Sequence, residues 1–224
     1  MRTAWRSGAM PDPIEKTLVA ALRASTVIGQ ISIQPTERGR FVLCHRDGQG
    51  GKPEIFRKPE DAIEIARYDD AGNYRPLKTA PNLRHGWRLE VVDLSELRRA
   101  LDYFYPGRLA MFAAWKESRL TTTPLRDTLD RQSGMYRIAA KISDEQIDDL
   151  VGNFCRSGGG CLRTILWKRN ASSTVPTTKL PPEKFSPAHD QTGRGDNAIP
   201  LLCQEPCALL VNECRKVVKG ETEE

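Results

Sequence analysis

The sequence predicts an α+β protein of two units, a small mixed α/β domain followed by a helical and loop-rich domain. Three observations predict this class. Short runs of alternating or β-branched apolar residues lie in the first half, apolar residues at helical spacing recur along the chain, and five of the six cysteines follow residue 143. With 224 residues and 39% hydrophobic content, the chain can bury one large core or two small ones.

Elements of both kinds are predicted in the first half. Gln30–Gln34 and Arg40–His45 predict two strands of a hairpin, because a turn-like segment separates them. Trp87–Val92 predicts a strand, and Asp93 with Glu96 three residues later predicts the cap of a following helix. Further helices are predicted over Ile14–Ala24, Pro59–Arg67 and Leu109–Arg119.

A boundary between the two units is predicted near 119–123. We divide the chain into an N-terminal extension (1–27), a first domain (28–119), a second domain (120–219) and an acidic tail (220–224). The predicted elements of the second domain are a helix from Thr123 to Gly134, a strand at Met135–Ile142, a helix from a Ser143 capping box to Phe154, and a strand at Leu162–Trp167.

Composition restricts the compartment. Charged residues make up 28% of the chain, and no window approaches the roughly 18 apolar residues of a membrane span. The basic start is followed by Pro11 and Pro13 instead of an apolar segment, so we expect no secretory signal and a cytoplasmic location. In a reducing compartment, six cysteines favour metal ligands or reactive thiols over disulfides.

The cysteines of the second domain form the main candidate site. Cys155 and Cys161 enclose a glycine-rich loop, whose backbone can approach a bulky group closely. The spacing of Cys203, Cys207 and Cys214 predicts one helical frame, with the first two side by side at i and i+4. Cys155, Cys161, Cys203 and Cys207 would be a complete thiolate set for a cubane iron–sulfur cluster or a tetrahedral zinc ion.

Spacing and charge favour the cluster. Structural zinc sites prefer Cys-x2-Cys pairs, which are absent here, whereas longer glycine-rich gaps better enclose inorganic sulfides. Cys44, in a predicted strand, and Cys214, among apolar neighbours, are interpreted as packing residues. The candidates to offset the negative charge of a cluster and to donate hydrogen bonds to its sulfurs are Arg156, Arg163, Arg215 and Lys216.

Long motifs resemble a known family. Phe154–Lys168, Leu180–Phe185 and Leu202–Leu210 resemble the 4Fe–4S-binding domain at the C-terminus of certain bacterial CbiX-type proteins, which are sirohydrochlorin cobaltochelatases. Pro59–Leu77 and Ala80–Leu89 resemble the small stabilising domain that accompanies it. The resemblance implies a [4Fe–4S] cluster held by Cys155, Cys161, Cys203 and Cys207.

The sequence departs from that family in having no chelatase domains, and its three histidines, His45, His85 and His189, lie in no chelatase motif. We therefore do not expect chelatase activity from this chain by itself. The resemblance implies a redox, electron-transfer or regulatory accessory in sirohydrochlorin or cobalamin-type tetrapyrrole metabolism, with a separate chelatase or a redox protein as partner. An anionic tetrapyrrole is a further candidate partner, because residues 1–142 hold 24 Lys and Arg against 17 Asp and Glu.

Two other function classes remain open. One is an enzyme that uses the cluster as a Lewis acid, for which only three ligands and an open iron are expected. The other is a zinc-stabilised nucleic-acid-binding module with a four-cysteine site, although we expect the aromatic residues concerned to pack in the core. Its positive charges and interleaved aromatics would be Arg84, Arg88, Arg98, Arg99 and Arg108 with Trp87, Tyr103 and Tyr105.

Overall fold

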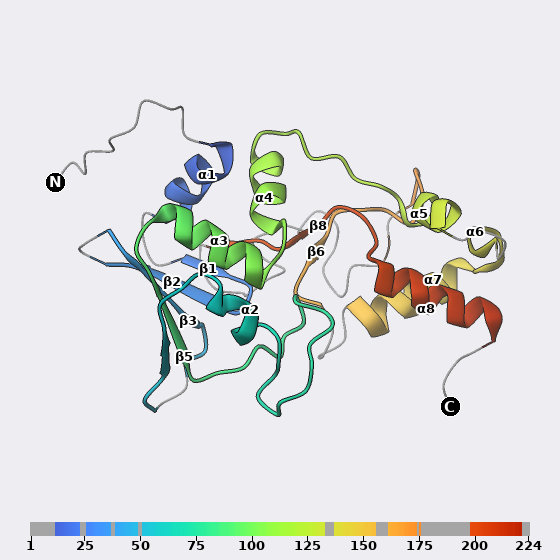
Figure 1. Cartoon of the computed structure of the whole chain (residues 1–224). Helices are drawn as coiled ribbons and strands as arrows, with labels where there is room; N and C mark the ends of the chain where they lie inside the picture. Colours follow the sequence, from blue (N-terminus) through green and yellow to red (C-terminus); the bar gives the residue numbers. More distant parts are fainter. Residues whose placement is uncertain are drawn as a thin grey trace.

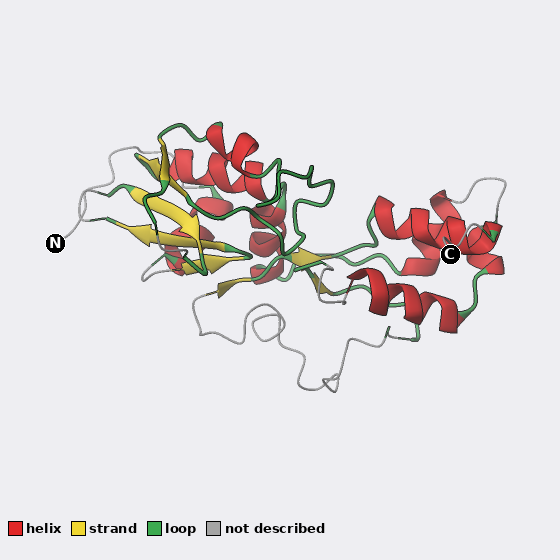
Figure 2. Ribbon diagram, turned by 90° about the horizontal axis from the view of Figure 1, so that it is seen from below, coloured by secondary structure: helices red, strands yellow, loops and turns green. Residues whose placement is uncertain are grey.

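The computed structural model contains two lobes, one built around a sheet and one built of helices, with a short pair of strands between them (Figure 2). It describes residues 12–22, 26–36, 39–48, 51–132, 137–155, 161–173, 175 and 198–220. Each lobe has its own cluster of buried apolar side chains. The predicted α+β class is confirmed.

A mixed sheet of six strands organises the first lobe, in the order β4-β5-β3-β2-β1-β7. The four central strands, β5, β3, β2 and β1, pair antiparallel with one another. The two edge strands pair in parallel, β4 with β5 and β7 with β1. The predicted hairpin is present as β2 and β3, in the register Ile33↔Leu43. The strands are β1 (Thr26–Ile28), β2 (Ile31–Pro35), β3 (Phe41–His45), β4 (Glu54–Phe56), β5 (Trp87–Val91) and β7 (Ala198–Ile199).

Helices cover one face of this sheet (Figure 1). The longest of them, α3, begins where predicted, because the Asp93 carboxylate accepts a hydrogen bond of 2.8 Å from the Glu96 amide. Its apolar face buries Leu97, and Phe104 stacks on Trp87 of the sheet with ring centroids 5.2 Å apart. The helices of this lobe are α1 (Pro13–Ala21), α2 (Asp61–Ile65), α3 (Leu94–Phe104) and α4 (Arg108–Lys116).

The chain returns to the first lobe near its C-terminal end. Ala198 and Ile199 of β7 pair with Val27 and Ile28 of β1, at the edge of the large sheet. The following residues, Leu201 and Leu202, are fully buried in the core of the first lobe. The two lobes are therefore interlocked, because β7 comes from a segment that follows most of the helical lobe in sequence.

Short helices form the second lobe. The predicted capping box is confirmed, since the Ser143 hydroxyl accepts from the Gln146 amide and the Gln146 side chain accepts from the Ser143 amide. A five-residue π-helical turn, Val151–Cys155, follows directly. The helices are α5 (Leu125–Gln132), α6 (Ile138–Lys141), α7 (Asp144–Leu150) and α8 (Ala208–Lys219), and the strands β6 (Thr164–Ile165) and β8 (Leu202–Cys203) join this lobe to the first.

Two predictions of local structure were wrong. The strand predicted at Met135–Ile142 is the short helix α6 over its described part, and α6 packs against α8. Cys203, Cys207 and Cys214 do not share a helix, because Cys203 lies in β8 and Cys207 is the N-cap of α8. Within the described part of the chain, no helix is long and apolar enough to cross a membrane.

Candidate metal centre

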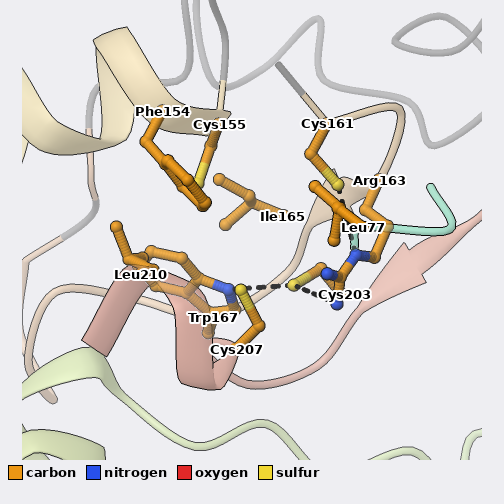
Figure 3. A pocket seen from close by; sticks show the side chains of 10 residues that line it. All are labelled: Leu77, Phe154, Cys155, Cys161, Arg163, Ile165, Trp167, Cys203, Cys207 and Leu210. Atoms are coloured by element: carbon orange, nitrogen blue, oxygen red, sulfur yellow. Dashed lines mark hydrogen bonds between the residues drawn. The ribbon is translucent and has the colours of Figure 1, made fainter. Parts of the chain in front are cut away.

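Four cysteines line one pocket at the junction of the lobes, and their sulfur atoms point toward one another (Figure 3). These are Cys155, Cys161, Cys203 and Cys207, the four ligand candidates named from the sequence. The other walls of the pocket are Leu77, Phe154, Arg163, Ile165, Trp167 and Leu210.

The first two cysteines are positioned by backbone contacts. Cys155 ends the π-helical turn, a local widening of a helix that is often found at functional sites. Cys161 lies just before β6, and its amide donates a 3.1 Å hydrogen bond to the Cys155 carbonyl. This bond holds the backbones of the two residues next to each other at the pocket.

The other two cysteines owe their positions to a strand pairing and a helix start. Cys203 is paired in parallel with Ile165 of β6, and its carbonyl accepts a 2.9 Å hydrogen bond from the Leu166 amide. Cys207 adopts extended backbone geometry as the N-cap of α8, and its carbonyl accepts from Val211. The helical frame predicted for this pair is therefore replaced by a strand, a turn and a helix start.

The chemistry of the donor set fits an iron–sulfur cluster. Four cysteine side chains from three segments of the chain line one pocket, and four thiolates are the ligand set of a cubane of iron and sulfide. Among the described residues, no three cysteine sulfurs lie within 4.8 Å of one another.

Hydrogen-bond donors surround two of the sulfurs. The Arg163 Nε lies 3.2 Å from Cys161 Sγ, and its Nη1 lies 3.9 Å from Cys203 Sγ. The indole Nε1 of Trp167 donates to Cys203 Sγ at 3.3 Å (Figure 3). The hydroxyl of Thr79, from the first lobe, lies 3.1 Å from Cys161 Sγ. These donors suit thiolates that carry negative charge onto a metal cluster.

Burial and neighbouring charges shift the pKa values of the ionisable groups in the pocket in opposite directions. Burial raises the pKa of Cys203, while the Arg163 guanidinium and the Trp167 indole act to lower it. Burial alone would lower the pKa of Arg163, but the sulfurs of Cys161 and Cys203 raise it above its usual value. Burial and the nearby Arg163 both lower the pKa of Arg108. The site thus combines desolvated thiols with a guanidinium that stays charged.

Only one of the four predicted basic partners contacts these sulfurs in the described structure. Arg163 does so, whereas Arg156 lies outside the described residues. The prediction for Arg215 and Lys216 was wrong, because Arg215 donates to the Gln132 carbonyl and Lys216 pairs with Glu213 at 3.2 Å. Both lie on α8 beyond the turn that carries Cys207, so their side chains reach the lobe surface instead.

The remaining described cysteines stay apart from the pocket. Cys214 is fully buried among the apolar residues of the second lobe, and burial raises the pKa of its thiol to about 12. Cys44 lies in β3 opposite Arg88 of β5, and burial raises its pKa as well. Neither residue is among those that line the cysteine pocket.

A second group of potential ligands lies in the first lobe, where nitrogen or oxygen atoms of His45, Asp47 and His85 come within 4.8 Å of one another. The Asp47 amide donates to His45 Nδ1 at 3.2 Å, and the Gln30 amide nitrogen lies 3.2 Å from His45 Nε2. The Gln30 orientation is fixed, since its oxygen accepts from the Leu83 amide. Both ring nitrogens of His45 thus contact polar groups of the fold, and we interpret the group as a structural contact.

Two family models match the chain in adjacent stretches. Residues 117–216 match the model described as a "4Fe-4S iron-sulfur cluster binding domain", and residues 16–119 match the one described as the "DR2241 stabilising domain". All four pocket cysteines lie within the first match. The chain is therefore an iron–sulfur protein with a 4Fe–4S cluster-binding domain, and its cofactor is a [4Fe–4S] cluster.

A solved structure gives a particular relative. The chain is similar to DR2241 from Deinococcus radiodurans, whose 1.9 Å crystal structure is described as a multi-domain protein with structural similarity to chelatases and two additional novel domains. The TM-score is 0.69 with 28% sequence identity, over 93% of this chain and 42% of that chain. This chain thus spans less than half the length of DR2241. No curated protein matches it significantly.

Proposed function

We propose that this chain is a redox or regulatory accessory of tetrapyrrole metabolism, of the sirohydrochlorin or cobalamin type. In this role it transfers single electrons, or senses redox or iron status, through a [4Fe–4S] cluster held by Cys155, Cys161, Cys203 and Cys207. Its partner is a separately encoded chelatase or a redox protein, and we do not assign chelation to this chain alone. The observation that carries the proposal is the set of four converging cysteines with three side chains placed to donate to their sulfurs.

The link to tetrapyrroles rests on a relative. DR2241 is described as similar to chelatases, and the match covers 93% of this chain but 42% of DR2241. The similarity to a protein of that description supports a chelatase-like protein as the partner. Attraction of a polycarboxylate tetrapyrrole by the basic first half supports the link more weakly. Some of its arginines are already paired with carboxylates of the same chain, Arg98 with Asp12 at 2.6 Å and Arg99 with Glu60 at 2.7 Å.

The zinc-stabilised nucleic-acid module receives no support. Besides Arg98 and Arg99, Arg84 pairs with Glu54 and Arg88 with Glu90, so these guanidinium groups are matched with carboxylates. Trp87 and Tyr105 are buried in the core and offer no stacking surface for a base.

Cluster assembly is the first experiment. Anaerobic reconstitution of the chain with iron and sulfide is expected to give equal amounts of bound iron and acid-labile sulfide, and a broad visible absorption that bleaches with dithionite. Cys155→Ser and Cys203→Ala are expected to lose most of that iron, because each removes a thiolate. The matched control is Cys214→Ala, which changes a buried cysteine of the same lobe outside the pocket and is expected to keep the cluster.

Three results would contradict the proposal. Zinc without labile sulfide in anaerobically purified protein would indicate a zinc site of four cysteines, and equal iron content in wild type and Cys155→Ser would remove that cysteine from the ligand set.

For the partner, reconstituted chain and a chelatase-like protein of the same organism are expected to co-elute in size-exclusion chromatography. Separate elution, with no effect of the chain on metal insertion into sirohydrochlorin, would overturn the pathway assignment.

A further inference from the structure

Thr79 brings a hydroxyl group from the first lobe to a cysteine of the second. It lies between α2 and β5 and is 5% exposed. Its Oγ1 is 3.1 Å from Cys161 Sγ, and its carbonyl accepts a 2.8 Å hydrogen bond from the Leu162 amide. Leu77, two residues earlier, lines the cysteine pocket beside Arg163 (Figure 3). One segment of the first lobe therefore forms part of the wall around the candidate cluster.

The direction of the hydrogen bond from Thr79 follows from its neighbours. The Arg163 Nε lies 3.1 Å from Thr79 Oγ1, and a guanidinium can only donate. Thr79 Oγ1 therefore accepts from Arg163, and its own proton is free to point to Cys161 Sγ. A cysteine bound to iron is a thiolate and can only accept, so Thr79 donates to Cys161, while the single Nε–H of Arg163 is shared between Thr79 Oγ1 and Cys161 Sγ.

A buried arginine holds this segment in place. Arg75 is 1% exposed, and its guanidinium donates to the carbonyls of Lys78 at 3.2 Å and Ala80 at 2.9 Å, on either side of Thr79. It also donates to the Ala66 carbonyl and to the Asn82 side chain. The residues on both sides of Thr79 are thus anchored through their carbonyls, and the Thr79 carbonyl is itself held by the Leu162 amide, so the hydroxyl is held beside Cys161.

We propose that Thr79 is a positioning residue that raises the reduction potential of the cluster by donating a hydrogen bond to Cys161. The inference rests on the proposed ligand set. One electron from a small reductant such as dithionite converts [4Fe–4S]2+ to [4Fe–4S]+, with no bond made or broken, and makes the site more negative. A donor to a ligand sulfur stabilises the more negative state, so it favours reduction. The first lobe, which holds none of the four pocket cysteines, then helps to set the redox property of the site.

The test compares two substitutions of Thr79 in the reconstituted full chain. Thr79→Val keeps the branched shape and removes the hydroxyl, and is expected to lower the midpoint potential measured by spectroelectrochemical titration. Thr79→Ser keeps the hydroxyl and is expected to retain the wild-type potential. The matched control is Thr128→Val, because Thr128 is fully buried in the second lobe and its hydroxyl donates within its own helix to Pro124. Its potential is expected to equal that of wild type.

Each outcome decides the inference. A lower potential in Thr79→Val alone supports it, and so does loss of the cluster in Thr79→Val when Thr79→Ser keeps both cluster and potential. An unchanged potential in a fully loaded Thr79→Val overturns it. Equal shifts or equal cluster loss in both variants also overturn it, because serine keeps the hydroxyl and the effect could then not come from its removal. Wild-type chain that binds no iron and sulfide would instead refute the proposed function.

Discussion

The Trp167 indole donates a 3.3 Å hydrogen bond to the sulfur of Cys203, and the two side chains are 3% and 7% exposed. Because both groups are buried, water cannot replace this donor when it is removed. Trp167→Phe keeps most of the volume and is expected to lower the midpoint potential of the reconstituted protein, with a loss of about 1 kcal/mol in the free energy of unfolding. Spectroelectrochemical titration and urea denaturation measure the two effects.

The control for that substitution is Trp115→Phe. Trp115 stacks on Phe112 in α4 and is not among the residues that line the cysteine pocket. Its substitution is expected to leave the potential unchanged. If Trp167→Phe binds a full complement of iron and has the wild-type potential, the hydrogen bond to Cys203 has no role in tuning the cluster.

The buried guanidinium of Arg75 predicts a large effect on stability. Arg75→Leu leaves the carbonyls of Ala66, Lys78 and Ala80 without this charged donor, although Lys78 Nζ also reaches the Ala66 carbonyl. We expect a loss of about 3–5 kcal/mol in the free energy of unfolding, measured by urea denaturation. Arg88→Leu, which removes an exposed ion pair with Glu90, should change it by less than about 1 kcal/mol. Similar losses in both variants would contradict this role of Arg75.

The backbone geometry at Gly29 predicts that a substitution there destabilises the fold. It has φ of +55°, and an added Cβ would lie 2.6 Å from the Tyr105 hydroxyl and 2.9 Å from Leu201. Gly29→Ala is expected to lose about 2–5 kcal/mol, the sum of left-handed strain and overpacking. Gly39→Ala has the same kind of backbone, with φ of +70°, but open space around it, and should lose only about 1–2 kcal/mol. Equal thermal denaturation midpoints would show that the close contacts are relieved without strain.

Patterns within a few residues predicted the helix caps correctly, but they failed where a segment takes its conformation from a partner far away in the sequence. Asp93 and Ser143 act within three residues, so their hydrogen bonds could be predicted from spacing. Cys203 is held in β8 by pairing with β6, some 38 residues earlier, which no local period reports. Thr79 contacts a sulfur 82 residues away and lies in no motif, so its part in the site could be found only from the folded chain.

The Arg215 and Lys216 error has the same origin. Proximity in sequence to Cys214 suggested a contact with the cluster, but Cys214 itself faces the apolar core of the second lobe. In a helix, residues next to a buried position point to other sides. Arg163 was placed correctly because it lies two residues after Cys161, close to a strand, where alternate residues share a face.

The buried imidazole of His45 predicts how stability changes with pH. Burial, with a smaller effect of the neighbouring His85, lowers its pKa from 6.5 to about 4. Above pH 6.5 the ring is neutral in both the folded and the unfolded chain. As the pH falls through that value, the unfolded chain binds a proton that the folded chain does not, so the free energy of unfolding decreases until about pH 4. Between about pH 7.5 and pH 5 this single group is expected to remove about 2 kcal/mol.

His45→Gln isolates this contribution, because every other titratable group is the same in the two chains. The variant is less stable at neutral pH if the packing around Gln30 is disturbed, but that loss is the same at each pH. The measured quantity is therefore the difference between wild type and variant in urea unfolding free energy at pH 7.5 and at pH 5. We expect the wild type to lose about 2 kcal/mol more than the variant over this range. Parallel losses would mean that His45 takes up a proton in the folded chain as readily as in the unfolded chain, and the Asp47 amide could then no longer donate to Nδ1.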